Sequence, residues 1–171
     1  MNRLIFDAGP LITSCKFSVA GRLVIDHILD HCPLAVAASV RDEVVLAGAR
    51  YPDAHAAEQR IEREQIEVLV PNPGSGLEAL IAPYNLGDGE RDSILLAGDA
   101  RLSKAVLVVD DHLAYLVCDR LGQRKRFLLD TIVDLVDAEM LDRSLAMDMV
   151  ETIRTRYPPA FVEHTKLLLQ R

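Results

Sequence analysis

Four acidic residues interrupt stretches that are otherwise apolar, and their positions predict a metal site. Asp7 and Asp111 each follow a short apolar run, while Glu43 and Asp92 lie on the apolar faces of two predicted helices. Carboxylates that are buried together are costly, because each loses its hydration and like charges repel. A cation would compensate them, and a set of oxygen ligands selects Mg²⁺ or Mn²⁺ over zinc. Such a centre suits phosphodiester hydrolysis.

Asp110 and Glu90 are further candidate ligands, because each lies beside one of these four acids. The sequence leaves open whether Asp110 or Asp111 faces inward. Glu90 lies two positions before Asp92, so it faces elsewhere on the helix and could sit at the rim of the site. Each acid also has a structural interpretation, since acids in the first turn of a helix favour its dipole and Glu43 could reach solvent.

The elements that must position these acids are short strands alternating with helices. This alternation predicts an α/β fold with a central, mainly parallel sheet flanked by helices. Ligands of such sheets bind beyond the carboxyl ends of the strands, where Asp7 and Asp111 are expected. The predicted strands are 4–6, 34–38, 66–70, 105–109 and 126–129, and 71–76 is the clearest loop. The predicted helices are 11–17, 22–31, 53–65, 77–84, 113–121, 131–140, 145–156 and 160–170, with two more beginning at Ser39 and Asp88.

Composition places limits on the class of protein. The 171 residues, half of them apolar, predict one domain (1–171) with a core of about 1–138 and a helical extension of about 139–171. The net charge of -7 argues against a broad basic face that tracks a nucleic acid. Three widely spaced cysteines indicate reduced thiols in a cytoplasmic protein, and no apolar run approaches the length that spans a membrane.

Basic residues and histidines offer few alternatives to the acids. The densest basic run, Arg120–Arg126, is either a phosphate-binding rim or a charged loop before a strand. His27 and His31 are four residues apart, but no further ligand accompanies them, and we interpret them as structural. Four isolated groups could contact a phosphate backbone, although such groups are more often solvated: Arg41, Arg91, Lys104 and His112.

The order of the acidic segments resembles the PIN domain, a family of metal-dependent ribonucleases. The resemblance covers most of residues 1 to about 138 and is closest to VapC-like proteins and an uncharacterised PIN-like subgroup with extra C-terminal helices. The matching segments are Ile5-Phe6-Asp7-Ala8-Gly9-Pro10-Leu11-Ile12, Val40-Arg41-Asp42-Glu43-Val44, Leu86-Gly87-Asp88-Gly89-Glu90-Arg91-Asp92-Ser93-Ile94 and Val108-Val109-Asp110-Asp111.

The resemblance implies a PIN-like three-layer fold and a Mg²⁺- or Mn²⁺-dependent endoribonuclease that hydrolyses RNA phosphodiesters with a metal-activated water. It further implies the toxin of a toxin–antitoxin pair, inhibited by a cognate antitoxin protein and commonly a homodimer. By resemblance, the acidic quartet is Asp7, Glu43, Asp92 and Asp111, in which Glu43 either binds the metal or orients a water.

Two other functions remain open from the sequence. The first is a non-catalytic PIN-like module that binds protein or RNA, favoured by the acidity of the chain and by Gly9, which stands where many PIN domains have Ser or Thr. The second is a phosphatase or receiver-like domain with Asp7 as nucleophile, for which suitably placed Thr, Ser and Lys residues are lacking.

Overall fold

We describe a computed structural model of the chain, which defines residues 2–72, 74 and 76–171. Positions 73 and 75 of the predicted loop lie outside the described residues. Five strands form one sheet in the order β5-β4-β1-β6-β7, and every neighbouring pair in it is parallel. The strands are β1 Leu4–Phe6, β2 Ser18–Val19, β3 Arg22–Leu23, β4 Leu34–Ala37, β5 Ile66–Leu69, β6 Val106–Val108 and β7 Lys125–Arg126.

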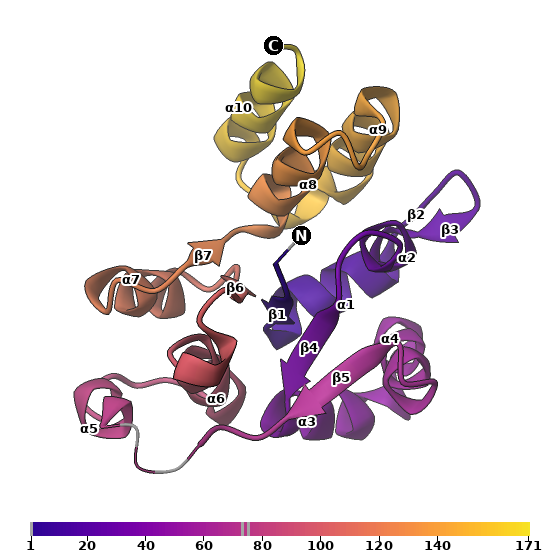
Figure 1. The fold of residues 1–171 in the computed structure, drawn as a ribbon. Helices are drawn as coiled ribbons and strands as arrows, with labels where there is room; N and C mark the ends of the chain where they lie inside the picture. The colour runs from indigo at the N-terminus through magenta and orange to yellow at the C-terminus, as the bar shows by residue number, and fades with distance from the viewer. Residues whose placement is uncertain (1, 73, 75) are drawn as a thin grey trace.

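Helices flank this sheet, so the predicted α/β fold class is confirmed (Figure 1). The α-helices are α1 Ala8–Lys16, α2 Val24–Leu29, α3 Ala38–Gly48, α4 Pro52–Glu62, α5 Leu77–Ile81, α6 Asp88–Ala97, α7 His112–Arg120, α8 Leu128–Asp137, α9 Arg143–Ile153 and α10 Pro159–Leu169. Two 3-10 helices, η1 Ala100–Leu102 and η2 Arg154–Arg156, complete the described elements.

Strand β1 is central and wholly buried, which explains its continuous apolar sequence. Leu4 aligns with Leu34 of β4 on one side and with Val106 of β6 on the other. Strands of a parallel sheet are covered on both faces, so they lack the polar alternation of half-exposed strands. Because neighbouring strands run the same way, the residues that follow β1 and β6 emerge at one edge of the sheet.

Helix α6 connects this edge to the rest of the core. It packs across β4, β1 and β6 and also contacts α3 and α7. Its residues Ile94 and Leu96 are fully buried, and they anchor its C-terminal half against the sheet. Its N-terminal turn is thereby held near the carboxyl ends of the strands and near α3.

The three C-terminal helices form a separate group in the fold, at the top of Figure 1. Helices α8, α9 and α10 pack on one another, and α9 also contacts β2. The buried apolar cluster is continuous with them and extends from Leu4 to Leu169. The last helices are therefore part of the hydrophobic core.

A short hairpin occupies the start of the helix predicted at 22–31. Strands β2 and β3 pair antiparallel, and α2 begins only at Val24. Ala20 and Gly21 form the turn with φ angles of 50° and 76°. Two successive positive φ angles suit a tight hairpin, and glycine adopts this conformation without strain. The prediction was wrong here, because the Ala-Gly pair was not recognised as a turn.

The last strand is also shorter than predicted, because a helix begins inside the range 126–129. β7 ends at Arg126, and the backbone N–H of Leu128 donates to Asp110 Oδ1 at 3.2 Å. The N–H of Phe127 donates to Asp130 Oδ2 at 3.3 Å. These two carboxylates satisfy N–H groups that a new helix leaves without partners, and they fix the start of α8.

Three further observations bear on the class of protein. Among the described residues, no helix has the length and apolarity needed to cross a bilayer. Cys15, Cys32 and Cys118 are buried thiols. His27 is buried, and its Nε2 lies 3.0 Å from the carbonyl oxygen of Val19, in keeping with its structural interpretation.

Candidate active site

Acids from four segments line one pocket at the carboxyl edge of the sheet. The pocket has a volume of about 260 Å³, and its lining side chains include Asp7, Glu43, Glu90 and Asp111. Asp7 follows β1, and Asp111 follows β6 after two further residues. Glu43 comes from α3 and Glu90 from the first turn of α6. Residues far apart in the sequence thus contribute carboxylates to one cavity.

Asp7 is the buried member of this group, with a relative exposure of 5 %. Its backbone N–H donates to the carbonyl of Val108 at 3.0 Å, which ties it to the end of β6. Burial, with smaller contributions from the charges of Glu90 and Glu43, raises the pKa of Asp7 to about 7. The N–H of Ala8 and the hydroxyl of Ser93 oppose this rise.

Glu43 reaches the pocket from an exposed position on α3 and binds the beginning of α6. The N–H of Gly89 donates to Glu43 Oε1 at 3.2 Å. A Cβ at position 89 would lie 2.8 Å from the same oxygen, so the glycine permits this approach. Partial desolvation is the main cause of the raised pKa of Glu43, and the charges of Glu90 and Asp88 add to it.

Asp111 and Asp110 have separate roles, which resolves the choice that the sequence left open. Asp111 lines the pocket and caps α7, where the N–H of Ala114 donates to its Oδ1 at 2.8 Å. Asp110 is absent from the described lining of that pocket. Its Oδ2 accepts the hydroxyl hydrogen of Tyr157 at 2.6 Å, and burial raises its pKa. Asp110 therefore links β6 to the C-terminal helices.

This link predicts a loss of stability when Tyr157 is replaced. Tyr157→Phe removes the hydroxyl donor from a partly buried carboxylate, which keeps the hydrogen bond from the N–H of Leu128. We expect the free energy of unfolding to fall by about 1.5–3 kcal/mol, the range for hydrogen bonds to charged groups. Urea unfolding measures this free energy. The control is Tyr51→Phe at an exposed tyrosine, which should change stability by less than about 0.5 kcal/mol. Equal stabilities of the two variants would contradict this role of Asp110.

Glu90 and Asp92 differ in their position relative to the pocket, and Glu90 lies where its predicted place at the rim allows. Glu90 lines the pocket, whereas Asp92 is absent from its described lining and from the charges that perturb Asp7 and Glu43. Ser93, three residues after Glu90 and on the same side of α6, lies with its Oγ 3.5 Å from Asp7 Oδ1. The apolar residues near Asp92 in the sequence indicate that this part of α6 is buried. Because α6 is buried on several sides there, they do not indicate which of its sides faces Asp7.

The acids of the pocket differ in exposure, as the sequence allowed for Glu90 at the rim and for Glu43 reaching solvent. Only Asp7 is buried, since Glu90 is partly exposed and both Glu43 and Asp111 are exposed residues. Backbone N–H groups satisfy three of the carboxylates: Gly89 binds Glu43, Ala114 binds Asp111, and the N–H of Gly87 donates to Glu90 Oε2 at 2.9 Å. The N-terminal turns of α6 and α7 thus offset part of the negative charge.

The donor chemistry fits a hard divalent cation, although the acids do not form a preassembled metal cluster. Within residues 2–72, 74 and 76–171, no group of three or more His, Cys, Asp or Glu side chains is arranged to hold a metal ion. Backbone N–H groups at helix ends bind one oxygen each of Glu43, Glu90 and Asp111. Each of these carboxylates keeps a second oxygen that could turn toward a cation.

The basic groups expected near the acids are dispersed. Arg41 pairs with Asp42 at 2.7 Å and Arg91 with Asp88 at 2.9 Å, while His112 is the exposed first residue of α7. Lys104 precedes β6, so it lies at the opposite edge of the parallel sheet from Asp111. Its predicted place beside the acids was wrong.

Sequence reasoning missed Gly89 and Ser93 as parts of the site. Gly89 contributes a backbone N–H and the absence of a side chain, and the Gly-Asp-Gly-Glu sequence was the available signal. Ser93 brings a hydroxyl to Asp7 from another helix, in a site where Gly9 provides none. No local sequence pattern predicts the role of Ser93, because Ser93 and Asp7 are 86 positions apart in the sequence.

Comparison with known proteins assigns the chain to a family. A family model described as a PIN domain matches residues 3–166. Neither the curated proteins nor the solved structures gave a significant match. The matched region includes every acid of the pocket and most of the C-terminal helices. The chain belongs to the PIN domain family.

Proposed function

We propose that this protein is a metal-dependent endoribonuclease that hydrolyses RNA phosphodiesters with Mg²⁺ or Mn²⁺. The observation that carries the proposal is the pocket itself, in which Asp7, Glu43, Glu90 and Asp111 converge from four segments of a PIN domain chain. Carboxylate oxygens are the donors that these cations prefer. Nucleases are typical of the family, which supports hydrolysis as the reaction.

Asp7, Glu90 and Asp111 would hold the cation, with Glu43 either binding it or orienting a water. When bound, the ion would lower the pKa of a water molecule and stabilise the charge that develops on the phosphate. Asp7 holds a proton over much of the range below pH 7, which it would have to release for the cation. Gly9 lines the pocket as an exposed residue, and a Cβ there would meet nothing within 4 Å.

The direct test is cleavage of a fluorescent RNA by the purified chain. We expect EDTA to abolish cleavage, and excess Mg²⁺ or Mn²⁺ to restore it, because carboxylates alone cannot neutralise a phosphate. Appearance of shorter labelled products on a denaturing gel measures the reaction. Cleavage that persists unchanged in EDTA would contradict the proposal and would point to a contaminating nuclease or to different chemistry.

A non-catalytic binding module is the second candidate, and the hydrogen bonds that hold three carboxylates at helix ends favour it. A protein that binds RNA without cutting it in any tested metal would support this candidate. A metal-stimulated cleavage activity that co-purifies with the folded chain would exclude it.

Gly89→Ala tests whether the Glu43 carboxylate contributes to cleavage. Alanine favours a helix over glycine by roughly 1 kcal/mol, and the three atoms nearest the new Cβ all belong to the flexible end of Glu43. We therefore expect unchanged or slightly higher stability, together with a loss of cleavage activity of about tenfold as the Glu43 carboxylate is displaced. Gly87→Ala is the matched control, since a Cβ there lies at an ordinary 3.8 Å from Glu90 Oε2.

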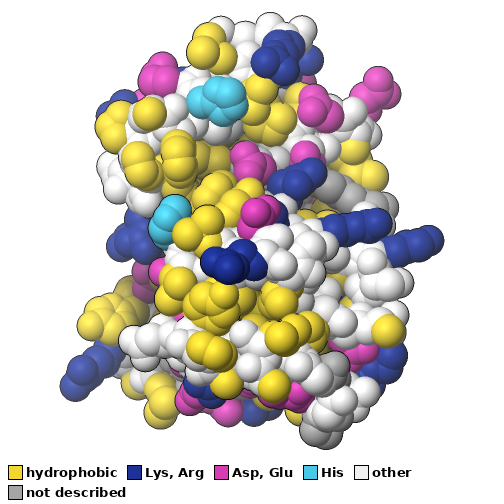
Figure 2. Space-filling model, turned by 90° about the vertical axis from the view of Figure 1, so that its left-hand side faces the viewer, with side chains coloured by type: hydrophobic (Ala, Val, Ile, Leu, Met, Phe, Trp, Pro, Cys, Tyr) yellow, Lys and Arg dark blue, Asp and Glu magenta, His cyan; other side chains and the backbone are white. Residues whose placement is uncertain are grey.

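Within this proposal the protein acts in the cytoplasm as the toxin of a toxin–antitoxin pair, as its likeness to VapC proteins suggests. Figure 2 shows hydrophobic side chains gathered on the face where α7 and α10 lie. Exposed residues there include Leu113, Leu116 and Phe161. This face could receive a cognate antitoxin or the second subunit of a homodimer. Growth arrest on expression, relieved by the product of an adjacent gene, tests the pairing.

A further inference from the structure

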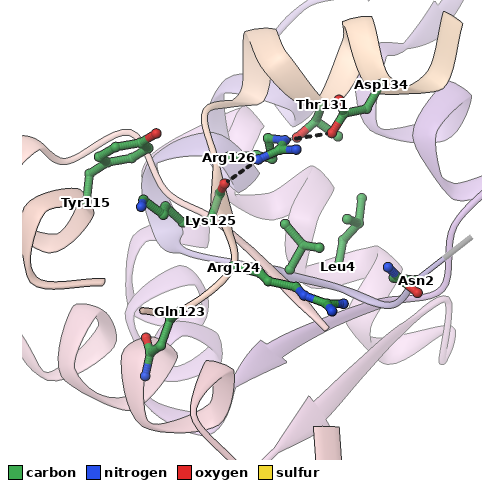
Figure 3. Close-up of a pocket in the computed structure, with 10 residues that line it drawn as sticks. Asn2, Leu4, Tyr115, Gln123, Arg124, Lys125, Arg126, Thr131 and Asp134 are labelled. Carbon is green, nitrogen blue, oxygen red and sulfur yellow. Dashed lines mark hydrogen bonds and ion pairs between the residues drawn. The ribbon is translucent and has the colours of Figure 1, made fainter. Parts of the chain in front are cut away.

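A second cavity lies at the opposite edge of the sheet from the acidic pocket. Leu4 and Val106, the first residues of β1 and β6, both line it. Because these strands are parallel, their first residues mark the edge away from Asp7 and Asp111. The cavity has a volume of about 430 Å³, within the usual range of small-ligand sites (Figure 3).

The wall of this cavity is basic, which is unusual in a chain with a net charge of -7. Arg124, Lys125 and Arg126 all line it, and they are the end of the dense basic run seen in the sequence. The acidic pocket makes no use of them. The run therefore needs an explanation of its own.

Two of these three charges are already compensated. Lys125 pairs with Asp119, and its Nζ lies 5.2 Å from the centre of the Tyr115 ring. Arg126 Nε pairs with Asp134 at 2.8 Å, and its Nη1 donates to the carbonyl of Lys125 at 3.1 Å. Asp134 also lines the cavity, but Arg126 neutralises it there.

Arg124 is the uncompensated cation. Among the described residues, no carboxylate or other acceptor binds its guanidinium group, and the residue is exposed. Figure 3 shows its side chain directed toward Asn2, below Leu4, while Arg126 is turned to Asp134. The guanidinium fork of Arg124 and the side-chain amide of Asn2 thus present hydrogen-bond donors to the same side of the cavity.

We propose that this cavity binds a phosphate group, held by Arg124 and assisted by the Asn2 amide. Arginine matches phosphate well, because its planar fork donates two parallel charge-assisted hydrogen bonds. The same chemistry is offered by inorganic phosphate, by a phosphomonoester at an RNA end and by the RNA backbone. The proposal goes beyond the ribonuclease assignment, because neither Arg124 nor Asn2 lines the acidic pocket.

The test is an NMR titration of the full chain in EDTA, which keeps any cleavage silent. The probes are inorganic phosphate, a 5′-phosphorylated trinucleotide and the same trinucleotide with a 5′-hydroxyl, each at constant chloride and ionic strength. We expect saturable shifts of the backbone amides of Asn2, Leu4 and Arg124. If inorganic phosphate binds most tightly, the ligand is free phosphate. If the 5′-phosphorylated trinucleotide binds most tightly, the ligand is an RNA end. If both trinucleotides bind equally and more tightly than phosphate, the ligand is the RNA backbone.

Variants decide whether Arg124 carries the interaction. Arg124→Ala should weaken binding of the tightest probe by about tenfold or more, because it removes a charge-assisted, two-pronged hydrogen bond. Arg120→Ala is the matched control, since Arg120 belongs to the same run and is exposed but does not line the cavity. The proposal is overturned if no probe gives saturable shifts at these residues, or if the two variants bind equally. Asp7→Asn should bind phosphate normally, so failure of the nuclease proposal leaves this test intact.

Discussion

Asp7→Asn should lower the rate of metal-dependent RNA cleavage by at least about a hundredfold. Asparagine has nearly the same shape as aspartate but offers no anionic oxygen, so it binds Mg²⁺ or Mn²⁺ poorly. Asp7 lines the pocket directly after β1, and the charges of Glu43 from α3 and Glu90 from α6 act on it. Initial rates across a series of Mn²⁺ concentrations measure the effect. A variant that cleaves RNA at the wild-type rate would refute the proposed role of Asp7.

The same substitution should stabilise the metal-free fold. A loss of cleavage activity in this variant would therefore not be caused by unfolding. The carboxyl group has a pKa of about 7 in the folded chain against 3.8 normally. Between these values the folded state keeps a proton that the unfolded state has released, so wild-type stability falls as the pH rises from about 4 to about 7 and then levels off. The asparagine side chain does not titrate, so the advantage of the variant should grow over this interval to at most about 4 kcal/mol. Chemical unfolding at pH 4.5 and pH 8 in EDTA measures this difference.

Glu90→Gln should lower cleavage whereas Asp92→Asn should leave it nearly unchanged, and this is the second-largest expected effect. Glu90 lines the pocket and its charge contributes to the raised pKa of Asp7, whereas Asp92 does neither. We expect Glu90→Gln to lower cleavage by about tenfold to a hundredfold, with Asp92→Asn close to the wild type. The expected loss is smaller than for Asp7→Asn, because the glutamine side chain can still accept the hydrogen bond from Gly87.

Measured Mn²⁺ affinity gives this comparison a second readout. The half-saturating Mn²⁺ concentration should rise for Glu90→Gln and stay constant for Asp92→Asn. The reverse result would restore the assignment that the helix pattern first suggested, and would mean that α6 turns when the metal binds.

The sequence allowed the sheet and two of the acids to be placed correctly, for a simple physical reason. Leu4–Phe6 and Ala105–Val109 are apolar without interruption, which is the signature of strands covered on both faces. Residues that follow parallel strands must emerge at one edge, so Asp7 and Asp111 had to lie near each other. The resemblance to the PIN domain predicted that Glu43 lies in the same site as Asp7 and Asp111.

What the sequence could not supply are contacts between distant elements. The rotation of α6 depends on how its buried sides fit β4, β1 and β6, and this fit decided between Glu90 and Asp92. The start of α8 depends on Asp110, a residue 18 positions away, which gives a helix cap where the local sequence predicted a strand. Such contacts leave no periodic signal within a segment of a single helix or strand.

The hydrogen bond between Tyr157 and Asp110 has a consequence for where the functional unit ends. Asp110 and Asp111 share a peptide unit, so the group that anchors one carboxylate also restrains the backbone that presents the other. A shortened chain that ends between residues 111 and 157 would keep all the acids of the pocket, yet Asp110 would lose the hydrogen bond from the Tyr157 hydroxyl. A minimal active fragment should therefore extend past residue 157, even though Asp111 is the last acid of the pocket in the sequence.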